Sequence, residues 1–183
     1  MKKAILALFF LLPLFTTYPP HSFCLPAEDV QVITDDYFQV AKKMIREAKH
    51  SIQVMMFEMD YYDRNPNTPS NHLIRELISA QKRGVKVEVL LEVREKEDRT
   101  TKRNRDTGKI LSNGGVEVIY DSLFKTTHAK YVVVDGRLTL LGSTNWTYFA
   151  LTNNNEASVL IRSKEVAKGF VDYFNQVKAA GGK

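Results

Sequence analysis

One stretch of the chain combines residue types and spacings that suit chemistry on a phosphate ester. It has the pattern H-x-K, four residues, D, six residues, G-S-x-N, with a glutamate eleven residues further on. Histidine changes protonation near neutral pH, because its ordinary pKa is about 6.5, and lysine is a compact cation with three donors. Together they supply a nucleophile or proton carrier and a fixed positive charge. The candidate catalytic residues are His128, Lys130, Asp135, Ser143, Asn145 and Glu156.

The elements that position these residues can be read from the same stretch. Residues 131–134 form an apolar run typical of a buried strand, Asp135 and Gly136 suggest a tight hairpin turn, and residues 138–141 return as the partner strand. Alternate side chains of a strand share a face, so His128 and Lys130 are expected to point the same way. Asp135 lies an odd number of residues from His128 and is expected to face away from the phosphate.

The second half of the pattern predicts groups that stabilise charge. Ser143 and Asn145 are two residues apart and can offer a hydroxyl and an amide to oxygens of the transition state. Gly142 is expected to permit a backbone conformation that other residues resist. Glu156 is expected to accept the second ring N–H of His128, which would fix its tautomer.

Simpler explanations exist for parts of this pattern. An isolated H-x-K pair is usually incidental, and Asp135 alone would be an ordinary turn residue. Ser143 lacks the G-x-S-x-G elbow of serine hydrolases, so a role as nucleophile is rejected. The complete pattern followed by Glu156 favours catalysis.

This pattern closely resembles the signature of the phospholipase D superfamily of phosphodiesterases. The resemblance implies that the residue matching His128 attacks phosphorus and forms a phosphohistidine, while the glutamate matching Glu156 orients it. It also implies that the matching lysine, serine and asparagine hold the phosphate and that the matching aspartate is a structural support. In that superfamily a second histidine, from a second copy of the motif, protonates the leaving oxygen.

The chain carries the motif once. Neither His50 nor His72 is followed by a lysine two residues later, and no internal repeat is found. The simplest solution is a homodimer with one composite site on its two-fold axis. The bacterial non-specific endonuclease branch of the superfamily has this single-motif form, and the resemblance spans roughly residues 28–180.

The N-terminus predicts export. Two lysines precede an apolar run over residues 4–15, which is the form of a secretory signal peptide. Residues 1–27 are the expected signal, with cleavage after Cys24 or Ala27, and residues 28–183 are expected to form a single phospholipase D-like nuclease domain. A periplasmic or secreted bacterial protein follows; the alternative is an uncleaved inner-membrane anchor that associates with the membrane. Cys24 is the only cysteine, so the mature domain contains no disulfide.

Charge suggests an anionic partner. The formal net charge is +5, and residues 94–109 hold seven Lys or Arg against four Asp or Glu. Such a segment suits contacts to a phosphate backbone that are independent of base sequence. The alternative is a solvated loop without a partner. The candidate substrate contacts, besides Lys130, Ser143 and Asn145, are Arg99, Lys102, Arg103, Arg105 and Lys125.

Periodicity along the chain predicts an α/β fold, with a mixed β-sheet sandwiched by helices, in agreement with the resembled phospholipase D-like fold. Helices are expected over residues 36–49, 71–83, 107–112 and 164–178. Strands are expected over residues 51–59, 85–91, 116–120, 131–134, 138–141 and 157–161. Residues 60–70 are expected to form a loop near the site.

Three aromatic residues follow the motif. Trp146, Tyr148 and Phe149 could stack on exposed bases, but a place in the core or in a dimer interface is favoured. No H-x-x-x-H pair, cysteine pair or dense carboxylate cluster indicates a metal, so no cofactor is expected. Activity is predicted to persist in a chelator.

Three function classes remain. The leading one is a metal-independent, non-specific endonuclease acting on DNA, with RNA as a further substrate. The alternative is a lipid phosphodiesterase, because the same chemistry cleaves phospholipid headgroups. A nucleic-acid-binding module without catalysis is disfavoured, since binding alone needs no oriented histidine.

Overall fold

A seven-stranded mixed sheet forms the centre of the computed structural model, which describes residues 24–181. The strand order is β1-β7-β6-β5-β2-β3-β4; β2, β3 and β4 run parallel, and the remaining neighbours are antiparallel. The strands are β1 (Asp29–Ile33), β2 (Ser51–Met56), β3 (Lys86–Leu91), β4 (Glu117–Tyr120), β5 (Lys130–Val134), β6 (Leu138–Gly142) and β7 (Ser158–Arg162). The helices are α1 (Tyr37–Glu47), α2 (Pro69–Lys82), α3 (Arg99–Asn113), α4 (Tyr148–Thr152) and α5 (Lys164–Ala180).

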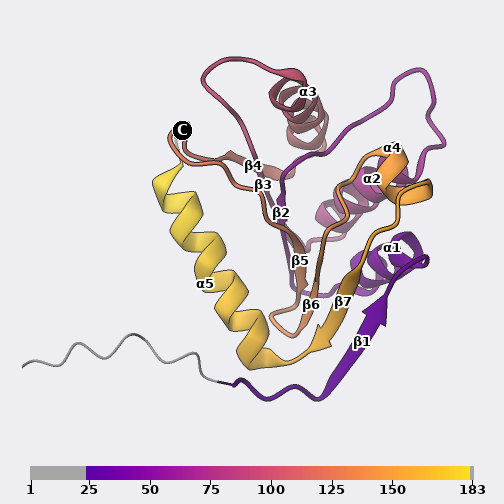
Figure 1. Cartoon of the computed structure of the whole chain (residues 1–183), viewed down its shortest axis with the longest axis vertical. Helices are drawn as coiled ribbons and strands as arrows, with labels where there is room; N and C mark the ends of the chain where they lie inside the picture. The colour runs from indigo at the N-terminus through magenta and orange to yellow at the C-terminus, as the bar shows by residue number, and fades with distance from the viewer. Residues whose placement is uncertain (1–23, 182–183) are drawn as a thin grey trace, which may run out of the picture.

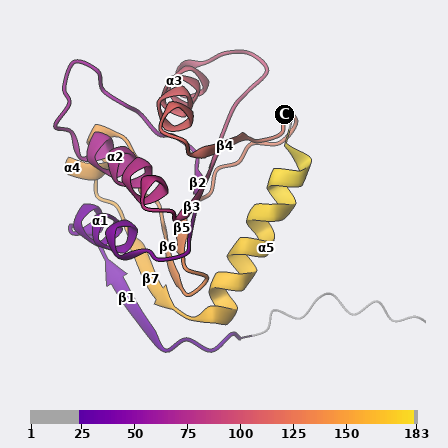
Figure 2. The same cartoon turned by 180° about the vertical axis from the view of Figure 1, so that it is seen from behind.

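Helices cover both faces of the sheet, which confirms the expected α/β sandwich. Helices α1 and α2 pack together on one face with α4 beside α2, and α5 crosses the other face (Figures 1 and 2). Alternation along the central strands serves both layers: Val132 and Val134 join the larger core under α1 and α2, whereas Tyr131 and Val133 join the smaller core under α5. Antiparallel pairing of β5 with β6 brings Lys130, at the start of β5, beside Gly142, at the end of β6.

Helix α3 differs from the sequence prediction. A helix was expected only over residues 107–112, after a basic loop, but it begins at Arg99, where the Asp98 side chain accepts a hydrogen bond from Thr101 N (2.8 Å). The buried stripe of α3 is largely polar: Asn104 Oδ1 accepts from Met59 N (2.8 Å), and Thr107 Oγ1 accepts from Tyr61 N (3.0 Å). An apolar stripe is the usual sign of a helix, so this one escaped hydrophobic periodicity.

Two short elements were also not expected. Strand β1 extends the sheet by pairing antiparallel with β7, and α4 is a five-residue helix capped by Thr147. The other helices and strands lie where periodicity predicted them, with ends that differ by up to three residues.

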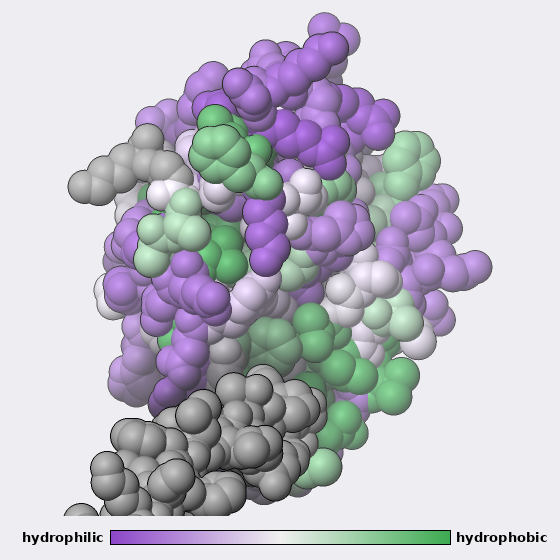
Figure 3. All heavy atoms as spheres, turned by 60° about the vertical axis from the view of Figure 1, so that its left-hand side comes forward, coloured by the Kyte–Doolittle hydropathy of each residue, from purple (hydrophilic) through white to green (hydrophobic). Residues whose placement is uncertain are grey.

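One part of the surface is notably apolar. Val30 and Val32, on edge strand β1, are 56 % and 76 % exposed. Figure 3 shows hydrophobic atoms gathered in the lower part of one face of the molecule. Between residues 24 and 181, no helix is both long and apolar enough to span a bilayer. The expected signal peptide lies almost entirely in residues 1–23, outside the described part of the chain.

Candidate active site

His128 and Lys130 lie at the point where the connection from β4 enters β5. Lys130 is the first residue of that strand, and its Nζ donates a hydrogen bond to the backbone oxygen of His128 (2.7 Å). The same Nζ lies 3.3 Å from Nδ1 and 3.5 Å from Nε2 of the His128 ring. As their spacing predicted, the cation and the imidazole are directed to one place.

Lys130 is a buried cation. The residue is 6 % exposed, and its Nζ lies 4.9 Å from the centre of the Phe57 ring. Burial lowers the pKa of Lys130, and the negative charge of Glu156 partly offsets this. Within residues 24–181 no carboxylate forms an ion pair with it. Its charge is therefore available to an anionic ligand.

The surroundings of His128 favour a neutral imidazole. Its ring packs at a tilt against Phe57, with 4.4 Å between the ring centres, which removes water from one side. This burial lowers the pKa of His128, and the positive charges of Lys130 and Arg94 lower it further. A neutral ring has the lone pair that a nucleophile needs. Phe57, which the sequence did not single out, thus contacts both members of the pair.

A buried carboxyl pair holds the segment before His128. Glu92 and Asp121 both accept a hydrogen bond from Thr127 N, at 2.6 and 3.1 Å. Burial raises the pKa of Glu92 to about 7, and the adjacent Asp121 contributes to this rise. Sequence reasoning missed this pair. A signal existed, because Glu92 and Asp121 each follow the carboxyl end of one of two parallel, adjacent strands.

Ser143 and Glu156 lie at the same end of the sheet. Lys130 begins β5 and Gly142 ends its partner β6, so Ser143 follows directly beside the Lys130 end. The Ser143 hydroxyl donates to Glu156, and Asn154 Nδ2 donates to Glu156 Oε1 (3.0 Å). The expected hydrogen bond from His128 to Glu156 is therefore not formed within one chain, because the carboxylate is engaged by Ser143 and Asn154.

Asn145 presents an amide without a protein partner. Its Oδ1 is buried, and neither end of the amide forms a hydrogen bond with another residue of the described chain. The following residue is tightly fixed: Trp146 N donates to Glu58 O (3.0 Å), and Asp60 N donates to Trp146 O (3.0 Å). Of the two ends of this amide, Oδ1 accepts and Nδ2 donates, so Nδ2 is the end that suits an anionic ligand.

Asp135 lies at the far end of β5, away from His128. Its carboxylate accepts hydrogen bonds from the backbone N–H groups of Lys49, His50 and Ser51, at 2.9, 2.7 and 3.0 Å. Partial burial would raise the pKa of Asp135, but these hydrogen bonds outweigh it and the pKa is lowered. Asp135 therefore ties the β5–β6 turn to the connection between α1 and β2.

Gly142 is required for a different reason from the one expected. Its φ does not lie in the left-handed region, so the expectation of an unusual backbone conformation was wrong. A Cβ at this position would instead clash with the Ser158 hydroxyl and lie 2.5 Å from Ala157 O. The glycine allows β6 and β7 to approach closely where Ser143 and Glu156 meet.

The predicted basic contacts are only partly grouped, since Arg99, Lys102 and Arg103 line one hollow on α3. On α3, Lys102 pairs with Asp106 (2.5 Å) and Arg105 lies over the Tyr120 ring (5.5 Å). Arg99 and Arg103 line a cleft with Tyr148 and Phe149, while Lys125 lies in a separate hollow beside α5. The basic residues thus form no single continuous patch.

The three aromatic residues separate in the same way. Trp146 is fully buried, and its Nε1 donates to Tyr37 Oη (3.1 Å), as the preference for a core position predicted. Tyr148 and Phe149 are exposed.

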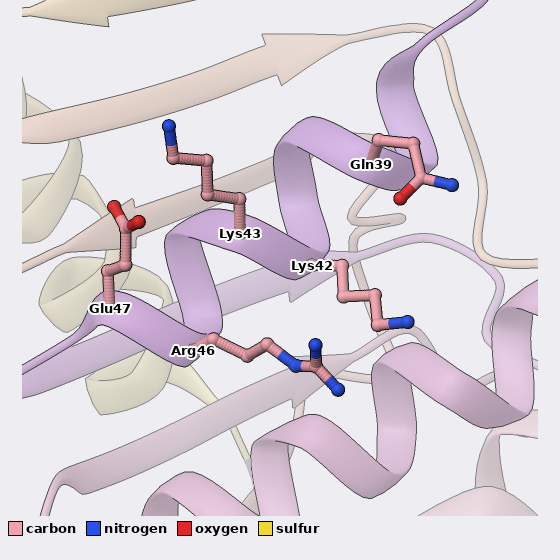
Figure 4. A pocket seen from close by; sticks show the side chains of 5 residues that line it. All are labelled: Gln39, Lys42, Lys43, Arg46 and Glu47. Carbon is pink, nitrogen blue, oxygen red and sulfur yellow. The ribbon is translucent and has the colours of Figure 1, made fainter.

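Two further features contain no site. In the described part of the chain, no three His, Cys, Asp or Glu residues are grouped closely enough to hold a metal ion. A hollow on α1 is lined by polar and charged residues of one solvated helix face. One of these residues, Arg46, is already paired with Glu76 of α2. Figure 4 shows these side chains, which are Gln39, Lys42, Lys43, Arg46 and Glu47.

Comparison with known proteins places this geometry in a family. The family described as "Cardiolipin synthase, PLD-like domain" matches residues 41–178. Mitochondrial cardiolipin hydrolase of Xenopus tropicalis is 27 % identical over 144 residues, which are 79 % of this chain and 62 % of that protein. Phospholipase D of Rickettsia felis is 29 % identical over 104 residues, 57 % of this chain and 50 % of that protein. The chain thus spans less than two thirds of these relatives.

Solved structures show the same fold. The phospholipase D family member Nuc from Salmonella typhimurium has a TM-score of 0.69 at 26 % identity, covering 84 % of this chain and 96 % of Nuc. NucT from Helicobacter pylori has a TM-score of 0.67 at 17 % identity, covering 84 % of this chain and 97 % of NucT. The pattern that begins at His128 lies inside the matched region. The chain belongs to the PLD-like domain family of the phospholipase D superfamily.

Proposed function

We propose that this protein is a phosphodiesterase that hydrolyses nucleic acid as a non-specific endonuclease, with DNA as its main substrate and RNA as a second one. The observation that carries the proposal is the buried Lys130 ammonium, which has no carboxylate partner in the described chain and contacts a His128 held neutral. A buried cation without a partner is costly, unless an anion completes the site. A phosphate diester is such an anion.

The proposed mechanism uses His128 as the nucleophile, as the resemblance to the phospholipase D superfamily implies. A ring nitrogen of His128 attacks phosphorus, a P–N bond forms, and the P–O bond to the leaving oxygen breaks as that oxygen takes a proton from a second histidine. That second histidine then removes a proton from water, the water oxygen attacks phosphorus, and the P–N bond breaks. Lys130 Nζ and Asn145 Nδ2 stabilise the non-bridging oxygens by donating hydrogen bonds to them as charge develops.

We infer that the second histidine comes from another chain, because the described residues 24–181 offer none at this site. In the described chain the other histidines are His50, at the opposite end of β2 from Phe57, and His72, on α2. Neither is placed to reach the leaving oxygen at His128. A homodimer that brings two His128 side chains to opposite sides of one phosphate completes the mechanism.

A lipid substrate is the second candidate. The names of the cardiolipin hydrolase and phospholipase D relatives support it, and so do the exposed apolar side chains of Val30 and Val32 on β1. Nucleic acid is favoured by the overall positive charge and by the cleft with Arg99, Tyr148 and Phe149 beside the motif. The apolar N-terminal sequence fits export, so we place the activity in the periplasm or outside the cell, with an inner-membrane anchor as the alternative.

Cleavage of plasmid and single-stranded DNA in excess EDTA tests the proposal. The unsubstituted protein is expected to cut both, and His128→Ala is expected to lose at least about a thousandfold in rate, because the nucleophile is gone. Vesicles containing cardiolipin are assayed in parallel, and circular dichroism shows whether the variant is folded. Equal DNA cleavage by both proteins, or cleavage of vesicles only, would contradict the proposed function.

A further inference from the structure

A cleft of about 440 Å³ opens beside the proposed phosphate site, which is formed by His128 and Lys130. It lies between the loop that follows β2, the first turns of α3, and α4. The residues that matter here are Glu58, Arg99, Arg103, Tyr148 and Phe149, and we call this site the aromatic cleft.

The aromatic cleft continues from the phosphate site along the chain on both of its walls. Glu58 directly follows Phe57, whose ring contacts His128. On the other wall, Thr147 lies two residues after Asn145, and the buried Trp146 between them donates its backbone N–H to Glu58 O (3.0 Å). These links place the cleft next to a phosphate held at His128. A group attached to that phosphate can therefore enter it.

Exposed aromatic rings form one wall of the cleft. Phe149 is 66 % exposed and Tyr148 38 %, and the two rings meet edge to face with 5.5 Å between their centres. Their support is rigid, because Tyr148 N donates to Tyr62 Oη (3.0 Å) at the start of α4. Exposed aromatic side chains on a fixed support are typical of surfaces on which unpaired bases stack.

The charges in the cleft separate a place for a base from a place for a phosphate. Arg103 pairs with Glu58 (2.6 Å) and Asp60 (3.0 Å), so its charge is already compensated, and these carboxylates repel phosphate. Arg99 is exposed and forms no ion pair in the described part of the chain. A neutral base therefore fits the interior, and a neighbouring phosphate fits the Arg99 rim.

We propose that the aromatic cleft is a base-stacking subsite, in which an unpaired base next to the scissile phosphate stacks on Phe149, so that the enzyme prefers single-stranded nucleic acid. This inference rests on the proposed nuclease function. Bases inside a duplex are already stacked and paired, so they cannot offer a free face to Phe149.

The test combines removal of the ring with removal of the bases. KM and kcat are measured for the unsubstituted protein and for Phe149→Ala on a single-stranded oligonucleotide, on its duplex, and on a fully abasic strand of equal length and charge. Phe149→Ala is expected to raise KM for the single strand by about tenfold or more, with a much smaller effect on the abasic strand. Phe149→Trp is expected to restore the KM.

Tyr173→Ala is the matched control, because Tyr173 is a similarly exposed aromatic residue on α5, across the sheet from the cleft. An unchanged KM of Phe149→Ala on the single strand would overturn the subsite while leaving the nuclease function intact. Equal losses on the normal and abasic strands would also overturn it, since the ring would then not act on bases. Failure of the unsubstituted protein to cut any nucleic acid would instead reject the nuclease function itself.

Discussion

His128 is held as a neutral ring by the residues around it. Phe57 shields one side of the imidazole, and the charges of Lys130 and Arg94 oppose protonation. The backbone just before it is held by Glu92 and Asp121 through Thr127 N. The position of His128 thus depends on Glu92 and Asp121, and the protonation of Glu92 changes near neutral pH.

Substitution of Glu92 should reveal this proton in the stability of the protein. The pKa of Glu92 is about 7 in the folded chain, above its ordinary value of 4.5. Between these values the folded state binds more protons than the unfolded state, so the free energy of unfolding falls as pH rises from about 5 to about 7. In Glu92→Gln this fall is removed, while the Gln oxygen still accepts from Thr127.

Urea unfolding at pH 5 and pH 8 measures the effect. The stability of Glu92→Gln relative to that of the unsubstituted protein is expected to be higher at pH 8 than at pH 5. Glu47→Gln, at an exposed glutamate near the end of α1, is the control and should show no such gain. The same stability difference at both pH values for Glu92→Gln would show that Glu92 does not carry the proton.

At the scale of the elements, the site depends on two strands that hold opposite ends of the motif. The β5–β6 hairpin brings Lys130 beside Ser143, and close contact of β6 with β7 at Gly142 brings Ser143 to Glu156. Asp135 fastens the turn of this hairpin to the start of β2. The aspartate of the motif therefore acts on the architecture and makes no contact with the site.

Asp135→Asn should lower stability without removing the turn. The substitution keeps a residue that tolerates the positive φ of 52° at this position, but it loses the charge that accepts three backbone N–H groups. We expect a loss of about 1.5–3 kcal/mol in the free energy of unfolding at pH 7.

The pH dependence identifies the cause. The pKa of Asp135 is lowered by folding, so its stabilisation is present above its ordinary value of 3.8 and is lost as pH falls through the folded value. The stability difference between Asp135→Asn and the unsubstituted protein should therefore shrink at low pH, as measured by urea unfolding at pH 3 and pH 7. A difference that stays constant would assign the loss to shape and not to charge.

At the scale of the whole molecule, the proposed mechanism requires two chains. A mixed dimer of unsubstituted protein and His128→Ala has one histidine at the composite site, so it should be inactive. With equal amounts of both chains and complete exchange by refolding together, about half of the activity of the unsubstituted protein should be lost. If each chain had a complete site of its own, none of this activity would be lost.

Cleavage of single-stranded DNA by the refolded mixture measures this loss. Subunits with different affinity tags show by co-purification that mixed dimers have formed, and Tyr173→Ala replaces His128→Ala in the control mixture. Full activity in the presence of mixed dimers would mean that each chain works alone. The shared site would then be wrong, although the fold and the family would not be affected.

The sequence by itself determined the family and which residues make up the motif. The residues from His128 to Asn145 are close in the chain, and strand alternation predicts where most of their side chains point, because this geometry is local. The hairpin and the mixed sheet followed from the same local rules, and the structure confirms them.

Only the tertiary structure decided which distant residues complete the site. Phe57 packs against His128, and Glu92 and Asp121 hold Thr127 just before it. Ser143 engages Glu156 in place of His128, and the polar stripe of α3 buries a segment that resembles a loop. These contacts join residues that lie far apart in the chain. They are set by how strands pair and helices pack, which local residue patterns do not encode.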